Sequence, residues 1–375
     1  MTAPAQSERP AANARLTMFG PAVACFVASR AVVLATVYVL PVLKPGYKRL
    51  AFFSDWDAGV YLRIARSGYP QLHSPGGGFD ATAAFFPLMP LVIRAVHEVT
   101  RLPYRTSGIL AANVAALAAC CVIWLLFREF AGERIATAGV MFLVFWPASF
   151  VLTSVFSDGL LLLFAAAFLL MLRRERWWGA FAFGVLAGLS RPDGVVLALC
   201  GGWAAYESFR RRRSWLPFVA VLGAPVGFLG YLGYLWHALG SPTAWFTAEH
   251  RGWGRGFDFG HAWWSNAFTA LHQPTARVDL VAATVAGIVG IVLVVEMIRS
   301  RLAPILTIYA GAVVALAIVT GAGASVPRYC LAAFPLFLVP ALRVPDRAKA
   351  TVVACSAGAL VLFTLVVTLT RTTTP

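Results

Sequence analysis

Residues 107–127 read SGILAANVAALAACCVIWLLF, an apolar run without a charged side chain. About 20 apolar residues in a helix are enough to cross the hydrocarbon core of a bilayer. Similar runs recur between residues 16 and 370. They are continuous rather than alternating, which favours helices over a β-barrel. The sequence therefore predicts an all-α polytopic membrane protein.

The whole chain has the composition of such a protein. Of its 375 residues, 59% are hydrophobic and 13% are charged, and the mean hydropathy is +0.75. The net charge is +15. Most of the cations interrupt apolar runs, so a membrane orientation signal explains them better than nucleic-acid binding does. We expect membrane lipids and no nucleic acid as partners, and the oligomeric state stays open.

The apolar runs predict eleven spans. Their approximate ranges are 16–43, 107–127, 134–153, 157–172, 177–191, 194–209, 215–239, 278–298, 302–321, 329–342 and 349–370. The Arg-Pro-Asp-Gly sequence at 191–194 is expected to turn two short spans into a hairpin. A second hairpin, 134–172, is expected to break at 153–158. Residues 1–15 are interpreted as a disordered cytoplasmic tail, and 16–375 as a single transmembrane domain.

Basic residues distinguish the two sides of these spans. Clusters at 173–176 and 210–213 mark one side, whereas the short turns on the other side carry only Arg191 and Arg328. The positive-inside rule then places the N-terminus in the cytoplasm and the C-terminus outside the plasma membrane. Two long outer loops follow, 44–106 and 240–277. In the first, we expect an interfacial or re-entrant helix around 85–98 and a flexible loop at 74–80.

Unusual polar residues collect on this outer side. Asp55 and Asp57 flank Trp56 directly after the first span, and such carboxylates are costly unless they bind something or do chemistry. Other outer turns contribute further candidates, namely Asp158, Arg191, Glu249, His250, Trp253, Arg328 and Tyr329. Charged groups at membrane depth are functional candidates by default, although any single one can be a solvated loop residue. Arg30, within the first span, could form an ion pair in the bundle or line a groove for a lipid phosphate.

Five local patterns together resemble the GPI mannosyltransferase 2 (PIG-V type) family. They are WDxxxYxxIAxxGY at 56–69, FFPLxPL at 85–91, SxxSD at 154–158, LSRPxG at 189–194 and PRYxxxxFP at 327–335. Each is weak alone, but their order and spacing cover most of the chain. The sequence departs from the family at Asp158, where a glutamate is usual, and at Val60, where an aromatic residue is common.

The resemblance implies a GT-C fold and an inverting glycosyltransferase that uses a polyprenyl-phosphate sugar at the outer membrane face. It also implies an aspartate as catalytic base, matched best by Asp57 and next by Asp55. The Ala- and Arg-rich composition indicates a high-GC, actinobacterial source, where no GPI acceptor exists. We therefore expect mannose transfer to a glycolipid, lipoglycan or protein acceptor.

The expected roles follow from this chemistry. A lipid phosphate is a good leaving group and needs cations rather than a general acid; the candidates are Arg328, Arg191, Arg30 and Arg94. Side chains expected to contact the sugar or the acceptor are Trp56, Tyr61, Asp158, Glu249, His250, Trp253 and Tyr329. No cofactor is expected, and two acids two residues apart are a weak metal signal, so we expect no metal.

Two other classes of protein stay open. A flippase or transporter of lipids or polyisoprenoid-linked sugars would carry charges through the membrane midplane and contain repeated broken helices. A structural scaffold would not need paired acids beside an aromatic loop. The sequence does not decide between mannose and another hexose or arabinose.

Overall fold

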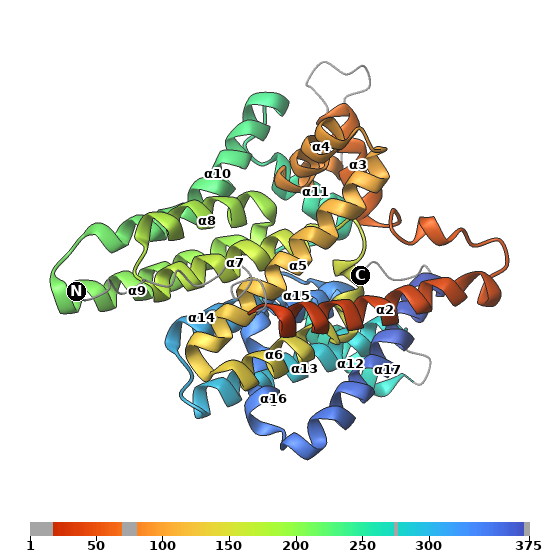
Figure 1. Ribbon diagram of the computed structural model, residues 1–375. Coiled ribbons are helices and arrows are strands. Elements are labelled where there is room, and N and C mark those ends of the chain that lie inside the picture. Colours follow the sequence, from red (N-terminus) through yellow and green to blue (C-terminus); the bar gives the residue numbers. More distant parts are fainter. Residues whose placement is uncertain (1–17, 70–80, 274–276, 371–375) are drawn as a thin grey trace, which may run out of the picture.

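The computed structural model describes residues 18–69, 81–273 and 277–370, and within these ranges the chain forms α-helices and short 3-10 helices without a strand (Figure 1). The all-α class predicted from the sequence is therefore confirmed. The tail predicted at 1–15 and the loop predicted at 74–80 lie outside the described residues.

The α-helices follow the predicted segments closely. In the first half they are α2 (Gly20–Leu43), α3 (Asp57–Ser67), α4 (Leu88–Thr100), α5 (Tyr104–Ala131), α6 (Glu133–Val144), α7 (Asp158–Arg173), α8 (Trp177–Ser190) and α9 (Leu197–Arg212). In the second half they are α10 (Val219–Leu239), α11 (Ala244–Trp253), α12 (His261–His272), α13 (Val278–Arg299), α14 (Pro304–Val319), α15 (Val326–Ala332), α16 (Leu338–Arg343) and α17 (Asp346–Thr370). The 3-10 helices are η1 (Arg49–Ala51), η2 (Ala81–Ala84), η3 (Pro147–Leu152), η4 (Pro192–Val196), η5 (Leu216–Phe218), η6 (Gly323–Ser325) and η7 (Phe334–Phe337).

Five helical segments of the described chain are long and apolar enough to cross a membrane. They are α2, α5, α10 with η5, α13 and α17. A sixth candidate is the pair of helical segments 323–332 and 334–343, which is bent by 68° at the break between them. Helices α8 and α14 are apolar but shorter. The structure thus describes a helical membrane protein with five or six candidate spans, and the count of eleven stays a prediction.

Two predicted spans are broken earlier than expected. Helix α6 ends at Val144 and is followed by η3, whereas the sequence analysis continued the span to residue 153. Pro147 opens η3, and proline lacks the N–H that would continue an α-helix. The span predicted at 329–342 is likewise interrupted between Ala332 and Phe334, next to Pro335.

Helix α7 forms the centre of the molecule. It packs between α5 and α8, and most of its side chains are buried around its whole circumference. A helix that is apolar on all sides is typical of the core of a large bundle. Its first turn approaches α5 so closely that a Cβ on Gly159 would lie 3.0 Å from the Ala116 nitrogen. The N-terminus of α7, with Asp158, is therefore fixed deep in the protein.

Small residues bring α8 and α10 into close contact. Gly184 and Gly188 of α8 face Gly223 and Gly227 of α10, and a Cβ on Gly227 would lie 2.2 Å from the Val185 carbonyl oxygen. Such spacing of small residues is a common way for apolar helices to approach in a membrane. This contact fixes the C-terminal end of α8, where Arg191 follows.

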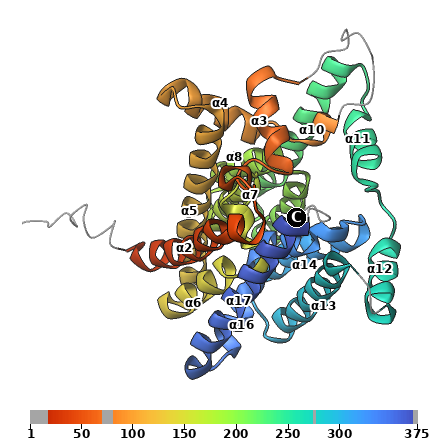
Figure 2. The same cartoon turned by 90° about the vertical axis from the view of Figure 1, so that its right-hand side faces the viewer.

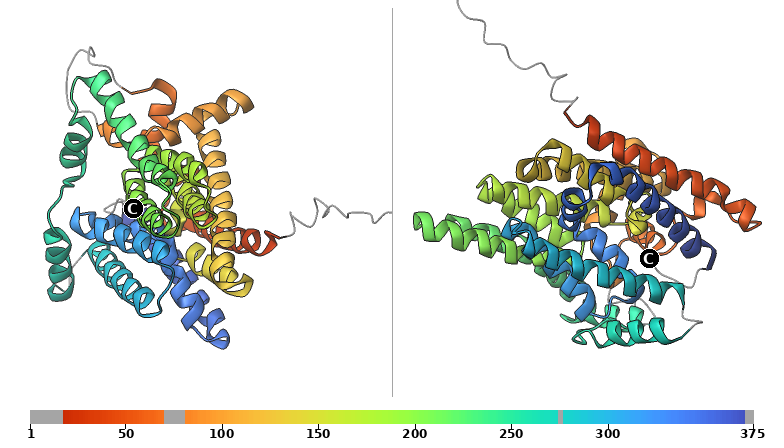
Figure 3. Two further views of the ribbon diagram at one scale, coloured as in Figure 1. Left: turned by 90° about the vertical axis from the view of Figure 1, so that its left-hand side faces the viewer. Right: turned by 90° about the horizontal axis from the view of Figure 1, so that it is seen from below.

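Four α-helices, α3, α4, α11 and α12, lie in the segments that were predicted as outer loops. Helix α4 forms at the position expected for the interfacial helix and packs beside α3. Helix α11 contacts η2, and α12 packs against α13 along one flank of the molecule (Figures 2 and 3). The ends of α3, α7, α8, α11 and α15 consequently meet at one place.

Candidate functional site

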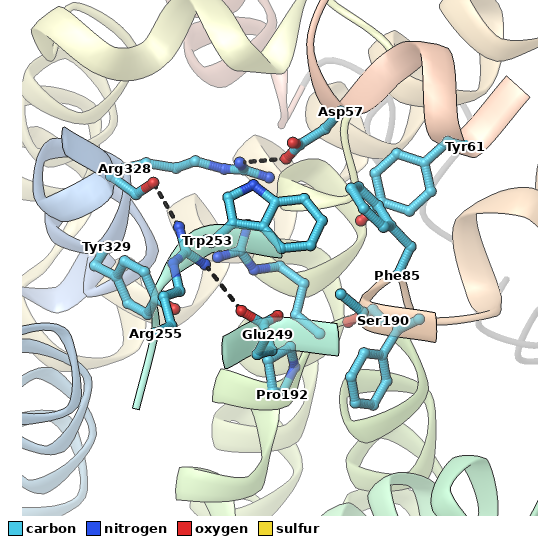
Figure 4. Close-up of a pocket in the computed structure, with 14 residues that line it drawn as sticks. Asp57, Tyr61, Phe85, Ser190, Pro192, Glu249, Trp253, Arg255, Arg328 and Tyr329 are labelled. Atoms are coloured by element: carbon cyan, nitrogen blue, oxygen red, sulfur yellow. Dashed lines mark hydrogen bonds and ion pairs between the residues drawn. The ribbon is translucent and has the colours of Figure 1, made fainter. Parts of the chain in front are cut away.

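A polar cavity lies where these helix ends meet (Figure 4). The space between its walls is about 550 Å³, including the open mouth. The cavity is lined by Asp57, Tyr61, Ala84, Phe85, Phe86, Ser190, Arg191, Pro192, Glu249, Trp253, Arg255, Ser325, Arg328 and Tyr329. Residues separated by up to 272 positions in the sequence thus share one cavity.

The cavity unites seven residues that the sequence analysis selected. They are Asp57, Tyr61, Arg191, Glu249, Trp253, Arg328 and Tyr329. Two pairs among them, Asp57 with Tyr61 and Glu249 with Trp253, are four residues apart on α3 and α11. Residues at this spacing share one face of a helix, so each helix presents an acid and an aromatic ring to the same space.

Asp57 begins α3 and is partly open to the cavity, with 19% of its side chain exposed. Its Oδ2 accepts a hydrogen bond of 2.7 Å from Arg328 Nη1. The preceding residue, Trp56, has a backbone φ of 55°. This conformation is costly for a bulky side chain, and such strain is concentrated at functional sites. The Trp56 ring packs edge-on against Phe52 and Phe150, and Trp56 does not line the cavity.

Beneath the cavity, Asp158 connects two buried arginines. Its Oδ1 accepts hydrogen bonds from Arg191 Nη1 at 2.9 Å and from Arg328 Nε at 2.8 Å. Its Oδ2 lies 2.8 Å from Arg328 Nη2. All three side chains are at least 92% buried. Asp158 is not part of the cavity lining, so it positions the arginines rather than facing a ligand.

Asp193 extends this arrangement to a chain of alternating charges. Its Oδ1 accepts a hydrogen bond of 2.9 Å from Arg191 Nε, giving the order Asp193–Arg191–Asp158–Arg328–Asp57. Three acids and two arginines leave this chain one negative charge. Buried ions are tolerated only when they are paired in this way. The chain therefore fixes the positions of both arginines and of Asp57.

A second acid and a third arginine face Asp57 across the cavity. Glu249 Oε2 lies 3.8 Å from Arg255 Nη1, and Arg255 Nη2 donates a hydrogen bond of 2.7 Å to Ser325 Oγ (Figure 4). Burial raises the pKa of Glu249, and the neighbouring Arg255 opposes that rise. Ionisation of Glu249 is therefore more difficult than that of an exposed glutamate, and the charge of Arg255 is less fully matched.

Aromatic rings form one wall of the cavity. Phe85 is the central ring, with Tyr61 at 5.0 Å and Trp253 at 5.5 Å between centroids. The Tyr61 hydroxyl is 2.8 Å from Ser157 Oγ, which fixes the ring against the start of α7. Rings of this kind offer apolar faces on which a sugar can stack, next to acids that can accept its hydroxyl protons.

Six of the predicted residues lie elsewhere. Asp55, Trp56 and Asp158 flank or underlie the cavity, and His250 is exposed on α11 outside the lining. Arg30 is buried against η3, where it donates hydrogen bonds to the Ser149 carbonyl oxygen at 2.8 Å and to Thr153 Oγ1 at 2.7 Å. It therefore joins α2 to η3. Arg94 lines a different cavity, between α3, α4 and α10.

The sequence analysis did not assign a role to several lining residues. The most important is Arg255, together with its partner Ser325 and the ring of Phe85. Arg255 lies two residues beyond the end of α11 at Trp253, so helical spacing would not have identified it. Phe85 belongs to one of the quoted motifs, although no contact with a ligand was inferred from it.

An apolar cavity adjoins the polar one. It has a volume of about 830 Å³, including its open side, and shares Pro192, Glu249, Arg255 and Tyr329 with the polar cavity. Its remaining walls are apolar except for Thr320, and are formed by Val195, Phe228, Trp245, Phe246, Gly256, Phe257, Leu316 and Thr320. Arg255 thus lies at the junction of a polar and an apolar space.

Within the described residues, no group of three or more His, Cys, Asp or Glu side chains is arranged to hold a metal ion. No protein-family model, curated protein or solved structure matches this chain.

Proposed function

We propose that this protein is an inverting glycosyltransferase that moves a sugar, mannose in the first instance, from a polyprenyl-phosphate donor to a membrane acceptor. The observation that carries the proposal is the convergence of Asp57, Arg191 and Arg328 on one cavity beside Glu249 and Trp253. Asp57, Arg191 and Arg328 belong to motifs that resemble the GPI mannosyltransferase 2 family, whereas Glu249 and Trp253 lie on α11, outside those motifs. Their convergence is what a shared chemical task requires.

The reaction assigns a distinct step to each group. Asp57 takes the proton from an acceptor hydroxyl, whose oxygen forms a bond to the anomeric carbon as the bond to the phosphate oxygen breaks. The lipid phosphate leaves with its electron pair, so no acid is needed on that side. When Asp57 becomes neutral, the alternating chain loses its excess negative charge. Arg328, no longer paired with an ionised Asp57, can then stabilise the negative charge that develops on the leaving phosphate.

The adjoining apolar cavity supports an amphiphilic donor. A polyprenyl-phosphate sugar has a lipid chain, a phosphate and a sugar ring in that order. The apolar cavity, Arg255 at the junction and the aromatic polar cavity provide matching surroundings in the same order. The raised pKa of Glu249 leaves Arg255 as the cation best able to take the phosphate in the ground state.

We also propose a GT-C fold with eleven spans, a cytoplasmic N-terminus and an active site on the outer face. The positions of the basic clusters support the orientation. Arg173, Arg211 and Arg212 line a separate cavity with Phe130 and Trp177. They share no cavity with the turns that carry Asp57 and Arg328. Basic residues and tryptophans grouped in this way are typical of the cytoplasmic membrane interface.

Asp57→Asn tests the proposal, with Asp55→Asn as the matched control. Both variants remove one charge within the same turn, but only Asp57 lines the cavity. Purified protein in liposomes would receive radiolabelled polyprenyl-phosphate mannose and a panel of lipid and peptide acceptors. We expect transfer by the wild type and by Asp55→Asn, and a loss of at least about 100-fold for Asp57→Asn. Normal turnover by Asp57→Asn would refute the base assignment, and donor translocation without transfer would support a flippase.

A further inference from the structure

A fourth cavity, the one that Arg94 lines, lies on the opposite side of the Phe85 segment from the polar cavity. It has a volume of about 790 Å³, including its open side. Its lining residues come from α3, α4, α8, α10 and the turn before α4, namely Ile64, Ala65, Gly68, Tyr69, Pro87, Pro90, Leu91, Arg94, Leu189, Gly230, Tyr231 and Tyr234. We call it the α3–α10 groove. It shares no lining residue with any of the three cavities described above.

A thin wall separates this groove from the polar cavity. The Phe85 carbonyl oxygen accepts hydrogen bonds from Tyr69 at 2.6 Å and from Tyr231 at 2.9 Å, and both tyrosines line the groove. The ring of Phe85 lines the polar cavity. In the same way, Leu189 lines the groove while its neighbour Ser190 lines the polar cavity. The two spaces are thus divided by single residues.

Helix α3 connects the groove to the candidate base. It begins at Asp57 and reaches the groove at Ile64, about 10 Å further along the helix axis. To present a hydroxyl to Asp57, the headgroup of a ligand in the groove has to extend about 10 Å back along α3 and past the wall at Phe85. The donor approaches from the other side, through the cavity at Arg255, so the two substrates would meet at Asp57 without competing for space.

The charge of the groove selects the kind of ligand. Arg94 is the charged residue of its lining and is exposed. Its Nε donates a hydrogen bond of 2.8 Å to the Ala65 carbonyl oxygen, so backbone oxygens hold the guanidinium in place. Among the described residues, no carboxylate forms a salt bridge with Arg94. The other lining side chains are apolar or tyrosine. An apolar groove with one cation at its rim fits acyl chains joined to a phosphate.

We propose that the α3–α10 groove binds the acyl chains of a lipid acceptor with an anionic phosphate headgroup, and that Arg94 pairs with this phosphate. The inference rests on the transferase function proposed above and narrows its acceptor from a lipid, lipoglycan or protein to an anionic glycerophospholipid derivative. The sequence predicted that Arg94 binds the phosphate of the donor. We propose instead that it binds the phosphate of the acceptor.

Gly230→Phe tests the groove directly. Gly230 lines the groove, and a Cβ added there meets no atom within 4 Å, so a ring can fill the space without disturbing the backbone. Gly233→Phe is the matched control, because Gly233 lies one turn further along α10, has equally open surroundings and is not part of the lining. A second variant, Arg94→Gln, removes the charge alone.

The first readout is independent of activity. Each variant would be irradiated in vesicles that contain phosphatidylinositol or phosphatidylcholine with a diazirine in one acyl chain, and labelled peptides would be mapped by mass spectrometry. We expect phosphatidylinositol to label the segments around Leu189 and Tyr234 about tenfold more than phosphatidylcholine, a difference of about 1.4 kcal/mol. Gly230→Phe should abolish this labelling and Gly233→Phe should not. Arg94→Gln should reduce it to the level of phosphatidylcholine.

The second readout is transfer from the polyprenyl-phosphate donor. Gly230→Phe should raise the acceptor KM about tenfold or more, again about 1.4 kcal/mol, and leave the donor KM unchanged. Equal labelling of all variants, or equal labelling by both lipids, would refute the assignment of the groove as an anionic phospholipid site, even if transfer occurs. Selective labelling without transfer by the wild type would overturn the transferase function and leave the groove as a phospholipid site.

Discussion

Replacing Asp158 with asparagine removes the carboxylate that contacts both Arg191 and Arg328. In the folded protein Asp158 accepts hydrogen bonds from both guanidinium groups, at 2.8 to 2.9 Å, and all three side chains are buried. Arg191 would keep its hydrogen bond to the buried Asp193, whereas the acid that Arg328 would keep as a hydrogen-bond acceptor, Asp57, is partly exposed. The neutral amide would leave the two buried guanidinium groups without the carboxylate that lies between them, so that their charges repel each other.

The magnitude follows from the burial of the pair. Removing one partner of a buried ion pair costs about 3–5 kcal/mol, because the other charge stays desolvated. For a chain of 375 residues, an unfolding entropy of about 2 cal/mol/K per residue converts this cost to a fall in Tm of about 4–7 °C. The exposed pair Glu207–Arg211 provides the control, since Glu207→Gln should cost only about 0.2–0.5 kcal/mol.

The assay is thermal unfolding of the purified protein in detergent, monitored by tryptophan fluorescence. The double variant Asp158→Asn/Arg328→Met should be less destabilised than the sum of its two single changes, because it removes the unmatched cation together with its partner. A Tm for Asp158→Asn within about 1 °C of the wild type, or strict additivity in the double variant, would refute the reasoning that the chain of charges is a coupled unit.

Two further changes probe other parts of the structure. In α10, Gly227→Ala should destabilise the protein by about 1–3 kcal/mol, since its Cβ would lie 2.2 Å from a carbonyl oxygen of α8. Gly233→Ala, in open surroundings, should stabilise the protein by about 0.5–1 kcal/mol. Equal melting temperatures of the two variants would contradict this. In the site, burial raises the pKa of Glu249, so rising pH ionises Glu249 and matches the charge of Arg255. The donor KM should therefore rise with pH. In Glu249→Gln the donor KM should be independent of pH. The same rise with pH in Glu249→Gln as in the wild type would contradict this role of Glu249.

Helix positions were predictable because apolar runs are a local property of the sequence. The run at 107–127 became α5 (Tyr104–Ala131), and most other predicted ranges agree with a helix within a few residues. Breaks were less predictable. The end of α6 at Val144 depends on Pro147 opening a 3-10 helix, and that helix is held in place by Arg30, which reaches it from α2. A contact between segments more than 100 residues apart leaves no local sequence pattern.

The same limit explains why Asp158 was assigned to the sugar. The sequence places a carboxylate at an outer turn, but only the packing of α7 between α5 and α8 shows that the turn is buried beneath the two arginines. The nearness of Asp158 to Arg191 and Arg328 was expected, whereas its depth beneath the cavity was not. For a charged residue in a bundle, the partner decides the role: Asp57 faces open space, and Asp158 faces guanidinium groups on two sides.

Helical periodicity would have sorted the residues of the second outer loop. Glu249 and Trp253 line the cavity, while His250 is exposed, as expected for a residue about 100° further around α11. Because residues 240–277 were predicted as a loop, helical periodicity was not used to distinguish their two sides. The segment is a poor span because it is charged, but charge does not prevent a short helix whose one face packs on the protein and whose other face meets water. Charged segments between spans therefore merit a test for helical periodicity, since the side that faces the protein identifies the residues available to a ligand.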